Sequence, residues 1–217
     1  DDATLLAALR SGKIDMAHNS GGIIVQTIDT VRSLQRTNPE LQVGAVWVYN
    51  NSSASMNRRN PPFDDIRVRQ AMQMALDLET INQAYYSGFA KSKPTGIVGP
   101  NLKGFYVPFE EWPEEVKKTY RYDPEGAEAL LDAAGYKRGA DGVRFKTTYV
   151  FRGVFDIGII EVLAGYWDEI GVKVAITPYD SPTWQAIVTE HSYEMATGAM
   201  GADLSPAAVL GWYSWAA

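Results

Sequence analysis

The residue whose type and position best fit binding chemistry is Asp203. It ends a glycine-rich turn, Gly201, Ala202 and Asp203, that follows an expected strand over residues 193–200. A carboxylate at the end of a strand can project into a cleft and accept hydrogen bonds from an ammonium group or a sugar hydroxyl. The alternative is a turn or helix cap ahead of Pro206. The residues alone leave both open, and we predict a ligand-binding turn here.

Aromatic rings offer a second kind of binding chemistry near this turn. The chain has 6 Trp and 12 Tyr, and several rings gather in its last segment: Trp184, Trp212, Tyr213 and Trp215. Flat rings suit the apolar faces of sugars and hydrophobic peptide side chains, and they lose little conformational entropy on binding. We predict Trp184 and Trp212 as ligand contacts. Packing of its own helix on the sheet is the alternative for Trp184, and core packing is the alternative for Trp212.

Catalytic and metal-binding patterns are missing from the sequence. It contains no H-E-x-x-H, no G-x-S-x-G and no Walker loop, and its 2 histidines are far apart. Asp64 and Asp65 are better explained as caps of the following helix, because carboxylates are favoured at a helix N-terminus. Arg67 and Arg69 have nearby helix acids as structural partners. We therefore expect no catalytic residues, no metal site and no cofactor.

Composition narrows the class of protein. The chain has 217 residues, of which 46% are hydrophobic and 21% charged, so it can bury a core as one large or two small domains. A net charge of −6 and an isoelectric point near 5.0 argue against nucleic-acid binding. No apolar run reaches the length of about 18 residues that a membrane-spanning helix needs. The absence of cysteine leaves the cellular compartment open.

The elements that must position these residues alternate between helix and strand. Apolar spacing and capping residues predict helices over residues 1–12, 23–36, 66–76, 78–86, 123–134, 155–170, 181–190 and 206–213. Alternating patterns predict strands over residues 13–17, 41–49, 144–151, 172–179 and 193–200. Ser181 is the expected N-cap of its helix, and the polar stretch after residue 49 is expected to be a link. Residues 94–113 are expected to be irregular. The pattern indicates an α/β fold with a mixed sheet flanked by helices.

The run from Asn60 to Ala90 adds a resemblance to a known family. It contains P-F-x-D-x-R-V-R-x-A from Pro62 to Ala71, and Ala75, Asp77 and Ile81 follow. This sequence pattern closely resembles a signature of the extracellular solute-binding proteins of ABC transporters, of the oligopeptide, dipeptide, nickel and oligosaccharide type. Further stretches that resemble the same family occur in the same order, over residues 122–136, 159–174 and 193–206.

The resemblance implies a fold, a domain division and a role. Residues 1–57 would be the tail segment of lobe I and the approach to the hinge, and residues 58–217 a periplasmic-binding-protein-like lobe II, incomplete at its C-terminus. The implied protein is not an enzyme. It captures a small solute, an oligopeptide or a similar molecule, between two lobes and delivers it to a membrane permease. It is implied to be periplasmic or extracellular, with or without a lipid anchor, and a monomer when full length.

The same resemblance implies a role for Asp203, and it shows one difference between this sequence and the peptide-binding members. In peptide-binding members, the matching aspartate grips the α-amino group of the ligand. Some members also carry arginines shortly before it that pair with the peptide C-terminus, whereas here Thr197 stands at one such position. A cation would then come from elsewhere, for instance from Arg152 or from the other lobe. An oligosaccharide-binding member therefore stays an alternative, as does a carbohydrate-active enzyme, although Asp203 has no evident second carboxylate as a partner.

Overall fold

The computed structural model describes residues 2–16, 28–42, 51–96, 98–100, 102–153 and 157–200. The chain divides into two compact units, Asp1–Trp47 and Val48–Ala217, which are treated separately below. The described part of the first unit contains helix α1, Asp2–Arg10, and helix α2, Ile28–Thr37. The strand expected over residues 13–17 is wrong where the chain is described, because residues 13–16 form a bend and coil and no other strand of the described first unit is present to pair with them.

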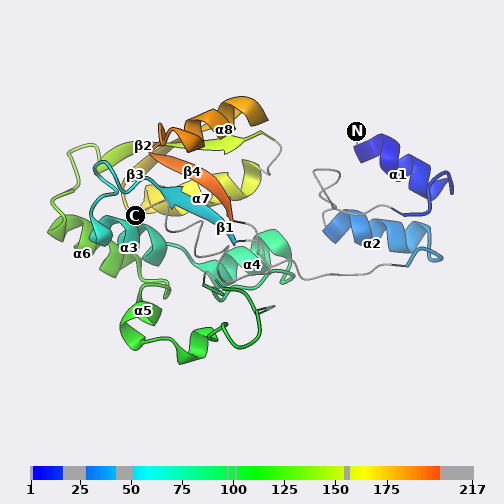
Figure 1. Cartoon of the computed structure of the whole chain (residues 1–217), viewed down its shortest axis with the longest axis horizontal. Coiled ribbons are helices and arrows are strands. Elements are labelled where there is room, and N and C mark those ends of the chain that lie inside the picture. The colour runs from blue at the N-terminus through cyan, green and yellow to red at the C-terminus, as the bar shows by residue number, and fades with distance from the viewer. Residues whose placement is uncertain are drawn as a thin grey trace. The chain divides into compact units, whose positions relative to one another are not determined.

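A mixed four-stranded sheet is the centre of the second unit (Figure 1). Its strands are β1, Asn51–Met56; β2, Phe145–Arg152; β3, Val172–Tyr179; and β4, Met195–Met200. Their order is β1-β4-β2-β3. Strand β2 is parallel to both β3 and β4, whereas β1 is antiparallel to β4. The expected α/β fold with a mixed sheet is therefore confirmed.

Strand β1 corrects one expectation from the sequence. Residues 50–55 were expected to form a polar link, yet Asn51–Met56 pairs with β4 along its whole length, from Asn51 opposite Met200 to Met56 opposite Met195. A strand at the edge of a sheet can be polar, because it is less buried than a central strand. The polar sequence of β1 therefore lacks the alternating apolar pattern that identifies a strand. The strand expected over residues 41–49 lies mostly outside the described residues. The assignment of residues 1–57 and 58–217 to two lobes stays a prediction.

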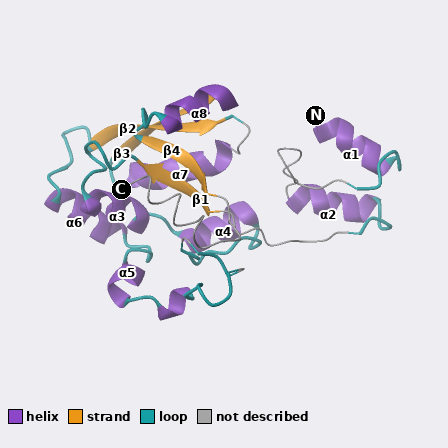
Figure 2. Ribbon diagram, viewed as in Figure 1, coloured by secondary structure: helices purple, strands orange, loops and turns teal. Residues whose placement is uncertain are grey.

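Helices cover both faces of the sheet (Figure 2). In the second unit they are α3, Ile66–Met74; α4, Leu78–Tyr86; α5, Glu114–Lys118; α6, Pro124–Ala133; α7, Ile157–Glu169; and α8, Ser181–Thr189. Aspartates cap four of them by accepting a hydrogen bond from a backbone amide of the first turn: Asp65, Asp77, Asp123 and Asp180. The cap of α8 is thus Asp180 and not the expected Ser181.

The main core lies between one face of the sheet and helices α3, α6 and α7. Tyr149 and Phe151 of β2 point into it, together with Trp167 of α7, which is 1% exposed. The Trp167 indole donates a hydrogen bond to the backbone oxygen of Met72 in α3 over 2.9 Å. The alternate residues of β2, including Val150, face helix α8 on the other side of the sheet.

A long excursion between α4 and α6 carries little regular structure, as expected. It contains the short helix α5 and, within the range expected to be irregular, one 3₁₀ turn, Phe109–Glu111. The excursion is braced by edge-to-face contacts among Phe109, Trp112 and Tyr120, with ring centroids 5.2 to 6.0 Å apart. These rings give the segment a small cluster of its own, apart from the main core.

Candidate functional site

Parallel strands bring their carboxyl ends to one edge of the sheet. Strand β2 ends at Arg152, which is in register with Tyr179 at the end of β3, and β4 ends in the same direction at Met200. We call these three strand ends the carboxyl edge. The Gly153 amide donates to the Tyr179 carbonyl over 2.8 Å, which ties two of the ends together. In open α/β sheets, ligands bind outside the carboxyl ends of the strands.

Helix α8 begins directly at the carboxyl edge. Asp180 follows Tyr179, and its side chain accepts a hydrogen bond from the Thr183 amide over 2.8 Å. This hydrogen bonding lowers the pKa of Asp180, so the cap carries a negative charge at neutral pH. The Trp184 amide in turn donates to the Asp180 carbonyl over 2.9 Å. The cap therefore fixes the backbone of the first turn of α8, and this sets the position from which the Trp184 side chain extends.

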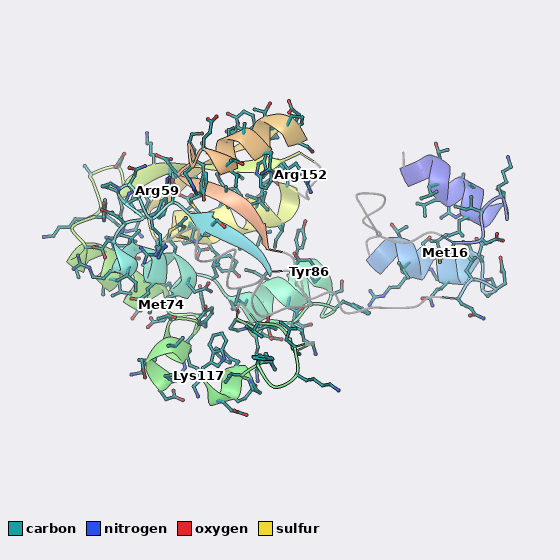
Figure 3. The ribbon with its side chains drawn as sticks, in the orientation of Figure 1. Met16, Arg59, Met74, Tyr86, Lys117 and Arg152 are labelled. Atoms are coloured by element: carbon teal, nitrogen blue, oxygen red, sulfur yellow. The ribbon has the colours of Figure 1, made fainter. Side chains whose placement is uncertain are left out.

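Arg152 and Trp184 meet at this edge. The Cζ atom of Arg152 lies over the Trp184 ring, 5.7 Å from its centroid, which is within the range of a cation–π interaction. Both side chains are half-buried. The Trp184 Nε1 atom is buried and has no hydrogen-bond partner among the described residues. Figure 3 labels Arg152 where β2 ends, beside helix α8.

A hollow lies between the sheet and the C-terminal part of α8. Its volume is about 360 Å³, and residues from β2, β3, the end of α8 and the following turn line it: Asn60, Thr148, Val150, Thr177, Tyr179, Ile187, His191, Ser192, Tyr193 and Glu194. The Glu194 carboxylate accepts hydrogen bonds from the Thr148 amide over 2.6 Å and from the Thr148 hydroxyl over 2.8 Å. These residues come from separate segments, so no local spacing in the sequence marks this hollow.

Comparison with known proteins assigns the family. A family model described as bacterial extracellular solute-binding proteins, family 5 (middle), matches residues 1–216. The chain belongs to this family. It is 26% identical over 186 residues to heme-binding protein A of Haemophilus influenzae, an alignment that covers 83% of this chain and 30% of that protein. It is 27% identical over 191 residues to a putative ABC transporter peptide-binding protein of Brucella ovis, covering 87% of this chain and 32% of that protein.

Solved family 5 structures share the fold. The periplasmic binding protein DppA of Helicobacter pylori, in complex with the peptide STSA, superposes with a TM-score of 0.69 at 22% identity, over 96% of this chain and 37% of that one. A dipeptide-binding protein of a Pseudoalteromonas species, in complex with Met-Leu, gives a TM-score of 0.67 at 25% identity, over 96% of this chain and 38% of that one. The chain thus spans about a third of the length of these relatives. The family consists of solute-binding proteins, which agrees with the expectation of a non-enzyme.

The predicted site residues of this family 5 chain fall into two groups. Gly201, Ala202, Asp203 and Trp212 lie outside the described residues and stay predictions. Trp184 is described and lies at the carboxyl edge, as does Arg152, which the sequence offered as an alternative cation. Sequence spacing gave no sign that these two side chains touch. Thr197 is buried, and its hydroxyl lies 3.3 Å from that of Tyr149.

Arg67 has the acidic partner expected of it, whereas Arg69 has a structural role of another kind. Arg67 forms an ion pair with Asp65, with Nη2 and Oδ2 2.6 Å apart. Arg69 donates to the backbone carbonyl of Phe63 over 2.6 Å. Asp77 caps α4. Within the described ranges, no group of three or more His, Cys, Asp or Glu side chains is placed to hold a metal ion. Among the same residues, no helix is long and apolar enough to cross a membrane.

Proposed function

We propose that this family 5 chain forms part of a two-lobed binding protein that captures short peptides and delivers them to an ABC permease. The observation that carries the proposal is the carboxyl edge, where Arg152 lies over Trp184 at the end of β2. Strand ends of this kind are where open α/β sheets receive ligands. Relatives named as peptide-binding proteins and solved structures with bound peptides support the peptide class.

In this proposal, different residues bind the two charged ends of a zwitterionic peptide. Arg152 would pair with the terminal carboxylate, and Asp203 with the α-amino group. Charge-assisted hydrogen bonds of this type contribute about 1.5–3 kcal/mol each, which corresponds to roughly 10- to 150-fold in affinity. The Trp184 ring would contact apolar parts of the solute.

Binding would act through closure of two lobes. A solute that contacts both lobes favours the closed state by its differential affinity for that state, and the closed form is then presented to the permease. The family is extracellular by description; a periplasmic location, a lipid anchor and a monomeric state are parts of the proposal. Because the second lobe would supply half of the contacts, we expect the 217-residue chain alone to bind peptides weakly or not detectably.

A thermal-shift screen of the full-length protein that carries this chain tests the proposal. The probes are di- to pentapeptides, malto-oligosaccharides and nickel chelates in separate arms. A ligand at about 100 times its Kd stabilises the folded state by about 2.7 kcal/mol, so peptides should raise the melting temperature by several degrees. Stabilisation by sugars or nickel chelates only would contradict the peptide assignment.

A variant and its matched control test whether peptides bind at the carboxyl edge. Arg152→Ala should weaken peptide binding by about 10-fold or more, because it removes the proposed partner of the carboxylate. Arg121→Ala is the control, because its exposed guanidinium pairs with Glu114 over 3.0 Å, within the excursion. Equal affinities for the two variants would contradict the role of Arg152.

A further inference from the structure

We infer that the hollow between the sheet and the C-terminal part of α8 is a second binding site, which takes a small organic cation with a primary ammonium group. The inference goes beyond peptide capture at the carboxyl edge, with which the hollow shares Tyr179. Its basis is the composition of the lining, which combines the Glu194 carboxylate with two tyrosines and contains no Lys or Arg.

The Glu194 carboxylate is oriented by donors to one of its two oxygens. Its Oε2 atom accepts hydrogen bonds from the hydroxyls of Thr147 and Thr148 over 3.1 and 2.8 Å, and from the Thr148 amide over 2.6 Å. These donors are neutral, and among the described residues Glu194 has no ion-pair partner and its Oε1 atom has no donor. The side chain is exposed, so a solute can reach it. An ammonium group would give Oε1 a charge-assisted hydrogen bond.

The turn that follows α8 is fixed by a buried asparagine from a distant segment. Asn57 is 5% exposed, and its Nδ2 atom donates to the carbonyls of His191 and Tyr193 over 3.0 and 2.9 Å. The Asn57 amide donates to the Glu194 carbonyl over 2.9 Å. These bonds hold the turn in place, including His191 with its left-handed φ of +55°. A solute therefore meets lining groups that are already ordered, which favours binding.

The surroundings of Glu194 favour a positive charge. Tyr179 and Tyr193 line the hollow, and the faces of aromatic rings attract ammonium groups. Burial raises the pKa of Tyr193, although the positive charge of Arg59 opposes this rise. Arg59 is exposed and is not part of the lining, so water and salt screen its charge. Helix α8 ends beside the hollow, and the C-terminal end of a helix carries partial negative charge.

The size and the remaining lining limit the solute to a small molecule. The volume of about 360 Å³ lies near the lower end of the range for ligand pockets. Val150 and Ile187 offer apolar surface to a short carbon chain, and Asn60 and Thr177 offer hydrogen-bonding groups to a second polar end. An aliphatic diamine, or an amine that also carries a guanidinium, has this combination of groups.

Calorimetry of the full-length protein with putrescine, agmatine and 1,4-butanediol tests the inference. Putrescine and 1,4-butanediol have the same carbon chain and differ in charge. We expect both amines to bind, and 1,4-butanediol to bind at least about 10-fold more weakly than putrescine, because it forms no charge-assisted hydrogen bond with Glu194.

A matched pair of variants locates the binding. Glu194→Gln removes the charge and keeps an acceptor for Thr148, and it should weaken putrescine binding by about 10-fold or more. Glu190→Gln makes the same change of charge at the exposed C-cap of α8, outside the lining, and should leave putrescine binding unchanged. Thermal melts without ligand show whether each variant is folded. If Glu194→Gln does not fold, the comparison of putrescine with 1,4-butanediol decides.

The outcomes separate this inference from the proposed function. Equal affinities for putrescine and 1,4-butanediol, equal losses in the two variants, or no detectable binding of either amine would each overturn the inference. Competition between putrescine and a bound peptide would show that the hollow is part of the peptide site, so that a second site is wrong while peptide capture stands. If the amines bind as expected and no peptide does, the proposed function fails and the inference stands.

Discussion

The bond between Trp167 and Met72 permits a quantitative test of how the second unit is held together. Met72 lies near the C-terminal end of α3, where helix carbonyls lose their intrahelical partners. The Leu76 amide donates to the Gln73 carbonyl over 3.2 Å, and the Met72 carbonyl accepts from the indole of Trp167 over 2.9 Å. Helix α7 thus supplies the cap of α3 through a side chain that is almost completely buried.

Replacing Trp167 with Phe removes this cap and keeps an aromatic ring. The Met72 carbonyl would remain buried without its donor, at a cost of about 1–3 kcal/mol. The smaller ring also leaves part of its site unfilled, which adds about 1 kcal/mol. We therefore expect the free energy of unfolding to fall by about 2–4 kcal/mol.

Trp112 provides a matched control. Its Nε1 atom also donates to a backbone carbonyl over 2.9 Å, that of Val107, but this bond lies at the exposed surface of the excursion, where water can replace the donor. Trp112→Phe should cost less than about 1 kcal/mol. Urea unfolding of the 217-residue chain, followed by far-UV circular dichroism, measures both. Losses that agree within error would refute the reasoning, since the two bonds differ in burial and not in length.

Two further predictions concern charge and capping. Hydrogen bonds from Arg138 and Arg144 lower the pKa of Glu128 below 4.5. A carboxyl with a lowered folded-state pKa contributes stability that is present above its unfolded pKa and lost as the pH falls through the folded one. Glu128→Gln should therefore flatten the pH dependence of unfolding free energy below pH 4.5, measured by urea titrations at several pH values; an unchanged slope would contradict this. Asp180→Ala should lower the free energy of unfolding, because it removes the cap of α8, and Ser181→Ala should lower it by much less in the same assay; the reverse order would show that Ser181 is the cap.

Local sequence signals predicted much of the second unit. Asp65 and Asp123 were recognisable caps, and the alternation over residues 172–179 gave β3 its full extent. Gly135 and Gly171 adopt φ values of +94° and +84°, which explains why glycine ends the elements before them. Each of these features depends on residues within one or two turns, so the sequence is sufficient to show them.

Features that depend on distant partners were not predictable in the same way. Strand β1 is polar and exists through its pairing with β4. The choice of Asp180 over Ser181 depends on where α8 begins, a boundary that pattern alone leaves uncertain by a residue or two. The contact of Arg152 with Trp184 joins β2 to α8, and no spacing rule connects two segments that meet only after the sheet has formed.

Hydrogen exchange of the full-length protein, with and without a saturating peptide from the screen, tests the central claim most directly. The account predicts that bound peptide slows exchange of amides at the carboxyl edge, from Arg152 to Gly153 and from Tyr179 to Trp184, and leaves the turn between α6 and β2 unchanged. Protection confined to the hollow around Glu194, with exchange at Arg152 and Trp184 unaltered, would contradict it.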